Sequence, residues 1–524
     1  MSLVLNKKKF VPSEQQKAYF NWIEVGEGSC IVEAVAGSGK TTTLIKGLEY
    51  MVGSIFFGAY NKKICDEIRA KAPAKDGLDI STMHAAGLAA WRKVHKHPEV
   101  DGDKVRNIFR EAMFRNAEYK PFMQVVVNLV SLAKQNGFGV NTPAFPTIQS
   151  RQSWIDLINH FDVETYDDKN DIDNTDIIIK LAICTLKESI KQNTTIIDFD
   201  DMIFAPLYHN VGFKRYDWVL VDEAQDTNAT RREMAIRMMK PTSRLVAVGD
   251  RRQAIYGFTG ADSDALDLIA QRTNAKQLPL YISFRCPKAV VAYAQKWVSH
   301  IQAAETAKEG VVRDINFDSL FTEARVGDAI LCRFNAPLVK YVYKFIAEGI
   351  PARIEGREIG NGIKTLASKW KVNSLDSLKT KLAAYYDREM KKFLEKDQEA
   401  KIVALDDKIE CLYVIMERVR EKNPSTTTPV EDIIAEVESI FTDDPKLKVV
   451  LLSSIHRSKG REWSRVIWLL TPENKRARLG WMLVQEDNLK YVAATRAQDE
   501  LILCDVSADM YADREKKYGQ IRTM

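Results

Sequence analysis

The feature that most constrains this chain is a short apolar run that leads into a glycine-rich turn. Residues 30–35 predict a buried strand, residues 41–51 predict a helix, and residues 34–41 read Ala-Val-Ala-Gly-Ser-Gly-Lys-Thr. Small residues let backbone N–H groups surround phosphate oxygens at the N-terminus of a helix. A strand before the turn and a helix after it argue against a chance glycine-rich turn. We therefore expect a parallel α/β sheet whose first strand ends in a phosphate-binding loop.

Two side chains of this loop would have separate chemical tasks. Lys40 would reach the β- and γ-phosphates of a nucleotide, and Thr41 would ligate Mg²⁺. The strict pattern G-x-x-x-x-G-K-[ST] is not met, because Ala34 stands at the position of its first glycine. The candidate nucleotide-binding residues of the loop are Ala36, Gly37, Ser38, Gly39, Lys40, Thr41 and Thr42.

A carboxylate pair later in the chain would supply the second half of the site. The apolar residues 219–221 would deliver Asp222 to Mg²⁺, while Glu223 would polarise the water that attacks the γ-phosphate. Taken alone, the pair could be an ordinary acidic loop. A kinase would need a different acceptor-binding apparatus, and residues 61–64, Asn-Lys-Lys-Ile, break the N-K-x-D signature of guanine recognition. ATP is therefore favoured over GTP.

Length and composition limit the remaining possibilities. The chain has 524 residues, which is too long for one hydrophobic core. A net charge of only +5 does not identify a nucleic-acid partner, and seven scattered cysteines without metal-binding spacing predict reduced thiols. No apolar run approaches the roughly 20 residues that span a bilayer, so we expect an intracellular protein without a membrane partner.

Helical periodicity interrupts the α/β pattern twice, which predicts two α/β domains that each carry an inserted, mainly helical subdomain. The expected boundaries are residues 1–84 and 197–276 for the first domain, 85–196 for its insertion, 277–356 and 446–524 for the second domain, and 357–445 for a second, short insertion.

The ordered motifs resemble those of the UvrD/Rep-like branch of superfamily 1 helicases over nearly the whole chain. Residues 249–261 are the most diagnostic stretch. In the family its glutamine, here Gln253, senses the γ-phosphate, and its aromatic, here Phe258, stacks on a base; a core aromatic is the alternative for Phe258. Thr259 replaces the family's usual arginine. Phe284 and the acidic segment that begins at Asp198 also resemble the F-box helicase group, although this segment could simply start a helix.

The resemblance implies further contacts to the nucleotide. Gln15 looks like the glutamine that reads adenine, and two arginines of the second domain would reach the γ-phosphate. The implied residues of the second domain are Phe284 against adenine, Arg285 and Arg496 at the phosphate, and Gly460 and Glu462 in the motif that contacts the ribose. In that motif Arg461 and Trp463 replace the usual leucine and phenylalanine.

The resemblance also implies a track for single-stranded DNA. The residues that match the family's DNA contacts are Tyr60, Asn61, Thr82, His84, Phe258 and His456. Taken alone, residues 59–62 and 82–84 would be surface loops, and His456 could be a structural histidine satisfied by backbone carbonyls.

Together the resemblances imply two RecA-like P-loop domains and an ATP-driven, Mg²⁺-dependent motor that unwinds DNA from 3′ to 5′ at junctions of single- and double-stranded DNA. The implied catalytic residues are Lys40, Asp222, Glu223, Gln253, Arg285 and Arg496. Its pathway would be DNA repair, replication or recombination, with repair or replication proteins as partners. The alternatives are a translocase that displaces proteins, a DNA-binding scaffold with structural ATP, and an RNA track. We expect a monomer, cytoplasmic and nucleoid-associated in a bacterium or phage, or nuclear in a eukaryote.

Overall fold

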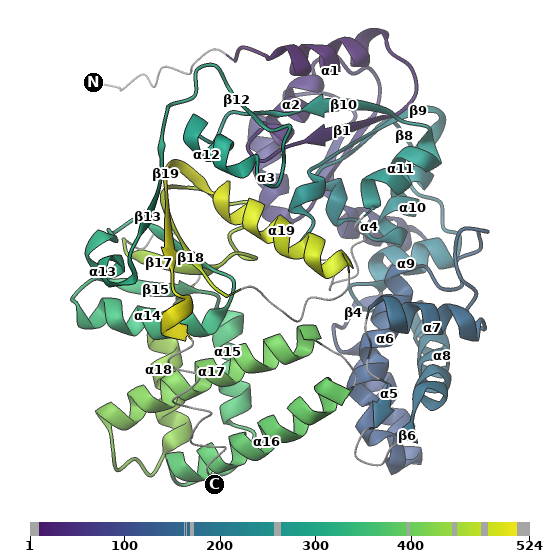
Figure 1. The fold of residues 1–524 in the computed structure, drawn as a ribbon. Helices are drawn as coiled ribbons and strands as arrows, with labels where there is room; N and C mark the ends of the chain where they lie inside the picture. Colours follow the sequence, from purple (N-terminus) through teal and green to yellow (C-terminus); the bar gives the residue numbers. More distant parts are fainter. Residues whose placement is uncertain are drawn as a thin grey trace, which may run out of the picture. The chain divides into compact units, whose positions relative to one another are not determined.

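The computed structural model describes residues 10–161, 163, 165–167, 172–255, 264–395, 399–442, 448–472 and 480–510. The chain divides into two compact units, of which the first comprises residues 1–166 and 173–282 and the second residues 167–172 and 283–524. Each unit contains one large parallel sheet flanked by helices (Figure 1). The predicted α/β fold class is therefore confirmed. Among the described residues, no helix is both long enough and apolar enough to cross a bilayer.

The sheet of the first unit has six parallel strands in the order β10-β1-β9-β8-β2-β3. They are β1 (Cys30–Ala34), β2 (Ile55–Ala59), β3 (Leu78–Thr82), β8 (Tyr216–Val221), β9 (Met239–Gly249) and β10 (Lys276–Leu280). Successive side chains of a strand point to opposite faces. Ile31 accordingly joins the core on one face and Val32 the core on the other. Burial on both faces explains why these strands read as continuous apolar runs.

Helices cover both faces of this sheet. The face of Val32 packs against α1 (Glu14–Val25), α2 (Lys40–Gly47) and α3 (Lys62–Lys71). The face of Ile31 packs against α4 (Met83–Val94), α9 (Asp201–Tyr208), α10 (Ala229–Arg237) and α11 (Ala265–Thr273).

Arg244 of β9 fastens the end of α1 to the sheet. Its guanidinium lies 3.9 Å from the ring centre of Trp22 and 4.5 Å from that of Trp218. It also donates hydrogen bonds of 2.7 Å to the carbonyl oxygens of Trp22 and Ile23, which are carbonyls of the last turn of α1. A cation at this end of a helix is favourable because the last carbonyls lack partners within the helix.

The first helical insertion leaves the sheet region after β4 (Glu99–Val100) and returns at β7 (Ile196–Ile197), and these two short strands pair in parallel. Its helices are α5 (Lys104–Arg115), α6 (Met123–Gln135), α7 (Arg151–His160) and α8 (Thr175–Gln192). The segment α4, which begins near the predicted boundary at residue 85, packs against α9 and the sheet.

The sheet of the second unit has seven parallel strands in the order β13-β19-β18-β14-β17-β15-β16. They are β13 (Val311–Ile315), β14 (Ala329–Cys332), β15 (Ala352–Glu355), β16 (Phe441–Thr442), β17 (Val450–Ser454), β18 (Trp463–Leu470) and β19 (Ala497–Asp505). The helices outside the insertion include α12 (Lys288–Ala294), α14 (Asn335–Ala347) and α19 (Gly480–Ala494).

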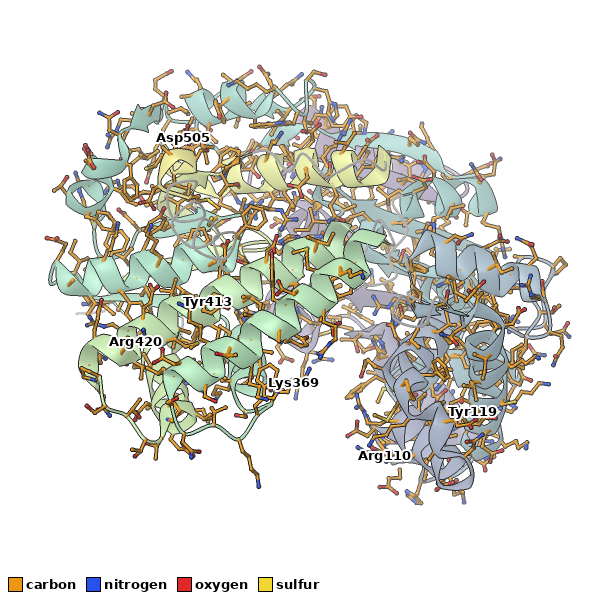
Figure 2. The ribbon with its side chains drawn as sticks, turned by 60° about the horizontal axis from the view of Figure 1, so that its bottom comes forward. Arg110, Tyr119, Lys369, Tyr413, Arg420 and Asp505 are labelled. Atoms are coloured by element: carbon orange, nitrogen blue, oxygen red, sulfur yellow. The ribbon has the colours of Figure 1, made fainter. Side chains whose placement is uncertain are left out.

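The second helical insertion lies between β15 and β16. It consists of α15 (Arg357–Ala367), α16 (Leu375–Glu395), α17 (Glu399–Lys422) and α18 (Pro429–Ile440). The two long helices α16 and α17 run beside each other in both views, with Tyr413 and Arg420 on α17 (Figures 1 and 2). Apolar residues of α15–α18 join the same core cluster as β15 and β17, so the insertion shares the core of the second sheet.

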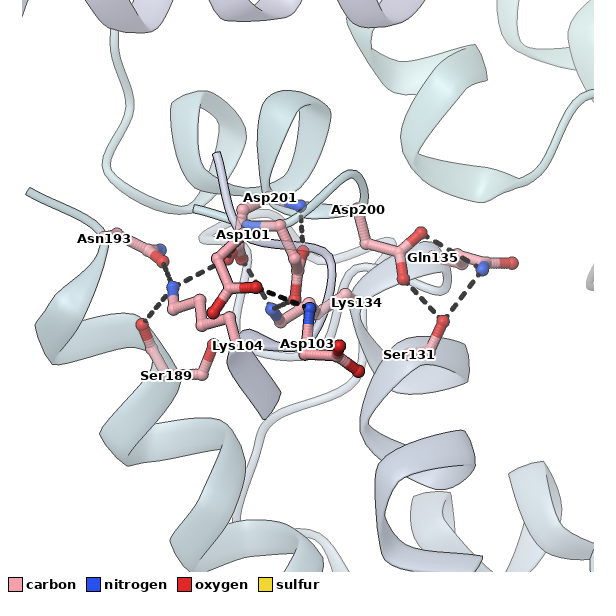
Figure 3. A network of polar contacts seen from close by, with 11 residues as sticks. Asp101, Asp103, Lys104, Ser131, Lys134, Gln135, Ser189, Asn193, Asp200 and Asp201 are labelled. Carbon is pink, nitrogen blue, oxygen red and sulfur yellow. Dashed lines mark hydrogen bonds and ion pairs between the residues drawn. The ribbon is translucent and has the colours of Figure 1, made fainter. Parts of the chain in front are cut away.

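A buried ion-pair network joins the first insertion to the sheet domain of the first unit (Figure 3). Lys134 of α6 lies 2.6 Å from Asp198 Oδ2 and 2.8 Å from Asp201 Oδ1, while Lys104 of α5 lies 2.7 Å from Asp201 Oδ2. Lys134 and Asp201 have no exposed surface. Asp198 Oδ1 also accepts a 2.8 Å hydrogen bond from the backbone N–H of Asp201 in the first turn of α9. The acidic segment thus has a structural task, which is to hold insertion helices against α9.

The charges of this network stabilise one another. Burial by itself would lower the pKa of Lys134, but Asp201 and Asp198 together raise it above its ordinary value. Burial would raise the pKa of Asp201, but Lys134 and Lys104 lower it below its ordinary value. Lys134 and Asp201 therefore stay charged at neutral pH although they are buried.

We expect the substitution Lys134→Met to destabilise the first unit by about 3–5 kcal/mol, because it leaves two buried carboxylates without one of their cations. Urea unfolding followed by circular dichroism measures this loss. The control Lys17→Met removes an ion pair whose side chains are 56% and 87% exposed. That control should change stability by no more than about 1 kcal/mol. Equal stability of the two variants would contradict the structural task of the network.

Candidate nucleotide and nucleic-acid site

Most predicted site residues of the first unit follow the carboxyl ends of its strands. The phosphate loop follows β1, Tyr60 follows β2, and Asp222 follows β8. Thr82 ends β3, and Gln253 lies just after β9. Because these strands are parallel, their carboxyl ends meet at one edge of the sheet. The structure thus brings together residues that are distant in the sequence, such as Lys40 and Glu223, which are 183 positions apart.

The phosphate loop has the backbone geometry that its glycines allow. Gly37 and Gly39 have φ angles of 73° and 77°, in the left-handed region that disfavours other residues. Gly39 is the N-cap of α2, so the first N–H groups of this helix face the loop. Thr43 donates a 2.9 Å hydrogen bond to the carbonyl of Gly39 and accepts one of 2.8 Å from Gln16, which supports the loop from α1.

Lys40 and Thr41 each contact one residue of the predicted carboxylate pair. Lys40 Nζ lies 2.9 Å from Glu223 Oε2, and Thr41 Oγ1 donates a 2.8 Å hydrogen bond to Asp222 Oδ2. Burial, and then the charge of Glu223, raise the pKa of Asp222 to about 6 against the opposing effect of Lys40. Burial would lower the pKa of Lys40, but the carboxylates led by Glu223 raise it. Lys40 is therefore a charged side chain surrounded by carboxylates.

A line of polar contacts continues from Glu223 to Gln253. Gln225 Nε2 donates a 2.5 Å hydrogen bond to Glu223 Oε2, and Gln225 Oε1 accepts one of 3.1 Å from the backbone of Asp250. Gln253 Nε2 donates a 2.7 Å hydrogen bond to Asp250 Oδ2. Glu223 itself has a φ of 51°, a left-handed conformation that is uncommon outside glycine and costs conformational energy. The side chain of Glu223 is thus fixed by its neighbours in an unusual backbone conformation.

These residues fit a nucleoside triphosphate with Mg²⁺. Ser38 Oγ is buried and has no hydrogen-bond partner among the residues that the structure describes, so it offers a free donor inside the loop. Backbone N–H groups of the loop and the ammonium of Lys40 would hold phosphate oxygens. Thr41 and Asp222 supply the oxygen ligands that Mg²⁺ prefers. Thr42, also predicted to bind the nucleotide, is exposed on the first turn of α2.

Gln15 contacts the end of β10 rather than the phosphate loop. Its Oε1 accepts a 2.7 Å hydrogen bond from the backbone N–H of Tyr281, which orients the amide group. Its neighbour Gln16 is 2% exposed and supports Thr43. Reading of adenine by Gln15 stays a prediction.

A pocket in the first unit has walls from both predicted sites. Asp222 and Glu223 line one part of it, and Tyr60 and His84 line another. Arg231 of α10 also lines this pocket. The predicted catalytic carboxylates and two predicted DNA contacts therefore line the same small pocket, so a ligand beside Tyr60 would lie close to the hydrolytic residues.

Two of the predicted DNA contacts in this region have local structural roles as well. Asn61 is the N-cap of α3 and accepts a 2.9 Å hydrogen bond from the N–H of Ile64. Thr82 is the N-cap of α4 and accepts one of 3.1 Å from the N–H of Ala85. Burial, and then Arg231, lower the pKa of His84 to about 4, so this histidine is neutral at physiological pH. Phe258 and Thr259 lie outside the described residues.

In the second unit, Arg285 and Glu462 form an ion pair. Gln498 donates a 2.8 Å hydrogen bond to Glu462 Oε1, so Glu462 is fixed from two sides. Phe284 is 50% exposed and has the free surface that a stacking platform needs.

Arg496 is almost fully buried, with 1% of its surface exposed. Its Nε donates a 2.9 Å hydrogen bond to the carbonyl of Val492, and its Nη1 one of 3.0 Å to the carbonyl of Arg461. Gly460, with a φ of 80°, forms the turn before Arg461. The guanidinium of Arg496 is therefore held by backbone carbonyls of its own unit.

His456 lies in the same loop as Gly460 and is half-buried. Burial, followed by Arg333 and Lys459, lowers its pKa to about 3. It is neutral at physiological pH, so it can bind a partner only by hydrogen bonding or packing.

Sequence reasoning passed over Gln225 and Asp250, which connect Glu223 to Gln253. Their signal was their position, one directly after the carboxylate pair and the other at the end of a buried strand. It also gave no role to Phe199, which is 61% exposed beside the buried network of the first insertion. The signal in the sequence is that this phenylalanine stands between two aspartates, Asp198 and Asp200, where an exposed position is expected.

Comparison with known proteins shows which family has this arrangement. The model described as the UvrD/REP helicase N-terminal domain matches residues 13–274, and that described as the UvrD-like helicase C-terminal domain matches residues 147–507. The ATP-dependent DNA helicase Rep of Buchnera aphidicola subsp. Schizaphis graminum is 25% identical over 304 residues, which are 53% of this chain and 43% of that protein. The F-box DNA helicase protein 1 of Schizosaccharomyces pombe is 24% identical over 525 aligned residues, which are 92% of this chain and 56% of that protein.

The ATP-dependent DNA helicase Rep of Escherichia coli K12 is 26% identical over 289 residues, which are 50% of this chain and 38% of that protein. The chain thus spans about half the length, or less, of these curated relatives. The two family models together cover almost all of the described residues, which confirms the predicted resemblance. The chain belongs to the UvrD/Rep helicase family.

Proposed function

We propose that this protein is an ATP-driven motor that moves on single-stranded DNA, and that it acts as a 3′–5′ DNA helicase. The pocket shared by Asp222, Glu223, Tyr60 and His84 is the observation that carries the proposal. A strand that bound across the mouth of this small pocket would lie beside the side chains that position the hydrolytic water. Binding of DNA and hydrolysis of ATP would then affect each other through direct contacts, as a motor requires.

The chain's own residues suggest how hydrolysis would proceed. Lys40 would exchange its contact with Glu223 for a phosphate oxygen, and Gln225 would keep Glu223 in place. Glu223 would then accept a proton from the attacking water, while Thr41 and Asp222 hold Mg²⁺. Gln253, connected to this group through Asp250, would respond to the loss of the γ-phosphate. Arg285 and Arg496 of the second unit would stabilise the charge of the reacting phosphate.

Steady-state ATP hydrolysis tests the proposal directly. The rate is measured without nucleic acid and with single-stranded DNA, matched RNA or blunt duplex DNA. Strong stimulation by single-stranded DNA alone supports a motor on that track. A hydrolysis rate that is the same with and without each of the three nucleic acids would contradict the proposal. Equal stimulation by RNA would change the proposed track.

The second candidate is a translocase that displaces proteins without separating strands. It is favoured by the limited size of the second insertion, which occupies residues 357–440 between β15 and β16. Unwinding of a duplex with a 3′ tail, beside one with a 5′ tail, tests helicase activity and its polarity. Displacement of a bound protein from a single strand, without unwinding of either duplex, would favour the translocase.

The substitution Glu223→Gln should lower the turnover number for ATP by about 100-fold or more, because it removes the proposed general base. The affinities for ATP and DNA should stay within about twofold, since the amide keeps the shape of the side chain. The matched control is Glu33→Gln. Its carboxylate is 22% exposed, against 24% for Glu223, and it pairs with Arg251. Near-normal turnover in Glu223→Gln would remove this residue from its proposed role.

His84 should contribute no charge to DNA binding between pH 6 and pH 8. Its pKa of about 4 lies below the ordinary value, so the folded protein keeps it neutral and would protonate it only as the pH falls towards 4. Each phosphate neutralised by a cation adds about 0.9 to the magnitude of the salt slope on duplex DNA and about 0.7 on a single strand. The salt dependence of DNA affinity should therefore be the same in wild type and His84→Asn at pH 6. A smaller slope in the variant at pH 6 only would show a charged histidine.

A further inference from the structure

Arg461 holds the loop between β17 and β18 through two contacts, one from its backbone and one from its side chain. Its backbone carbonyl accepts the 3.0 Å hydrogen bond from Arg496 Nη1. Its side chain forms an ion pair with Glu355. The usual leucine of this motif could make the first contact but not the second. The side chain of Arg461 therefore adds an ion pair at the same residue whose backbone carbonyl accepts a hydrogen bond from Arg496.

Glu355 provides a rigid anchor for this ion pair. It is the last residue of β15 and is only 2% exposed. Its Oε2 accepts a 3.0 Å hydrogen bond from Ser453 Oγ on the neighbouring strand β17. Both carboxylate oxygens therefore have partners, one from the sheet and one from Arg461.

Glu355 is also the residue from which the second insertion departs. Gly356 follows it with a φ of 126° and is the N-cap of α15. The insertion returns at β16, where Thr442 is the parallel partner of Glu355. The ion pair therefore connects the loop of Arg461 to the point at which α15–α18 leave and rejoin the sheet.

The position of Arg496 depends on this loop in two places. Its guanidinium donates to the carbonyl of Arg461, and its own carbonyl accepts a 3.0 Å hydrogen bond from the N–H of Trp463. A shift of the loop would consequently move both the guanidinium and the backbone of Arg496. Glu355 is buried whereas the side chain of Arg461 is 39% exposed, so removing Arg461 leaves a buried carboxylate without its cation, and such a shift is the expected response.

We propose that Arg461 and Glu355 are positioning residues that hold Arg496 in place for ATP hydrolysis and connect it to the base of the second insertion. The kinetic part of this inference rests on the proposed function. The mechanical connection between Glu355 and Arg496 does not, and it is tested separately.

The kinetic test compares Glu355→Gln, Arg461→Leu, Arg461→Lys and the double variant Glu355→Gln/Arg461→Leu in ATP hydrolysis stimulated by single-stranded DNA. We expect the turnover number to fall about tenfold in Glu355→Gln and in Arg461→Leu, because small displacements of a positioned group cost rate. The KM for ATP and the affinity for DNA should stay within about twofold. Arg461→Lys, which can still pair with Glu355, should recover part of the rate. The double variant should be no slower than either single variant, because the two residues act as one unit.

The matched control is Glu436→Gln in α18. Glu436 is 7% exposed and lies 2.7 Å from Lys422, so the substitution also neutralises a buried, paired carboxylate of the same unit. It has no contact with the loop of Arg461 among the described residues. Its turnover should equal that of wild type. Normal turnover in Glu355→Gln and Arg461→Leu, equal loss in Glu436→Gln, or additive loss in the double variant would overturn the kinetic proposal.

Hydrogen exchange tests the mechanical connection without any need for activity. The amide of Trp463 should exchange faster in Glu355→Gln than in wild type or Glu436→Gln, because its acceptor on Arg496 is less firmly held. Unchanged exchange at residues 461–463 would overturn the connection. A wild-type protein without DNA-stimulated hydrolysis would instead reject the proposed function, and the exchange result would still decide whether Glu355 and Arg461 hold Arg496.

Discussion

The parallel arrangement of the first sheet is the constraint on which the candidate site depends. Parallel strands end at a common edge, so the loops after β1, β2, β8 and β9 are neighbours although they are distant in the sequence. The phosphate loop, the carboxylate pair and Tyr60 all use this edge. Burial of both sheet faces keeps the strands in register and so fixes the relative positions of these groups.

Charge pairing at this edge is accompanied by backbone strain. Lys40 offsets the charge of Glu223, while Glu223 adopts a left-handed backbone conformation that its side-chain contacts with Lys40 and Gln225 help to hold. Burial, and then repulsion by the carboxylate of Glu223, raise the pKa of Asp222. A cation beside Asp222, such as Mg²⁺, would relieve this repulsion. The site is thus electrostatically prepared for a ligand that brings both phosphate and a divalent cation.

The sequence predicted the fold class and the family well, because both depend on local patterns. The run from β1 through the phosphate loop to α2 is readable from apolar spacing and glycine positions, and the structure confirms the sheet that it predicts. Tertiary contacts were less predictable. Lys134 pairs with Asp198 across the first insertion, and no local pattern in either segment identifies the other as its partner. The same holds for Arg461 and Glu355, where the sequence showed only that an arginine stands at a leucine position.

The functional roles of single residues are harder to predict than their positions. Asn61 and Thr82 were assigned to DNA by resemblance, and both also cap helices. An N-cap and a nucleic-acid contact require the same polar residue types, so sequence alone does not separate the two roles. Arg496 was expected to reach a phosphate, whereas its guanidinium here donates to backbone carbonyls. Its phosphate contact remains a prediction, because side-chain direction depends on packing that no motif records.

The pairing of β15 with β16 has a consequence for how this protein can change over evolution. Ile354 and Glu355 lie beside Phe441 and Thr442, so the second insertion begins and ends on adjacent strands. Its extension would leave the order of the other strands in the sheet unchanged, whereas its removal would expose the core that it shares with β15 and β17. The entropic cost of closing such a segment grows slowly, by only about 0.6 kcal/mol for each doubling of its length. The loops between α15, α16, α17 and α18 can therefore lengthen while the sheet and the core that it shares with these helices keep their structure.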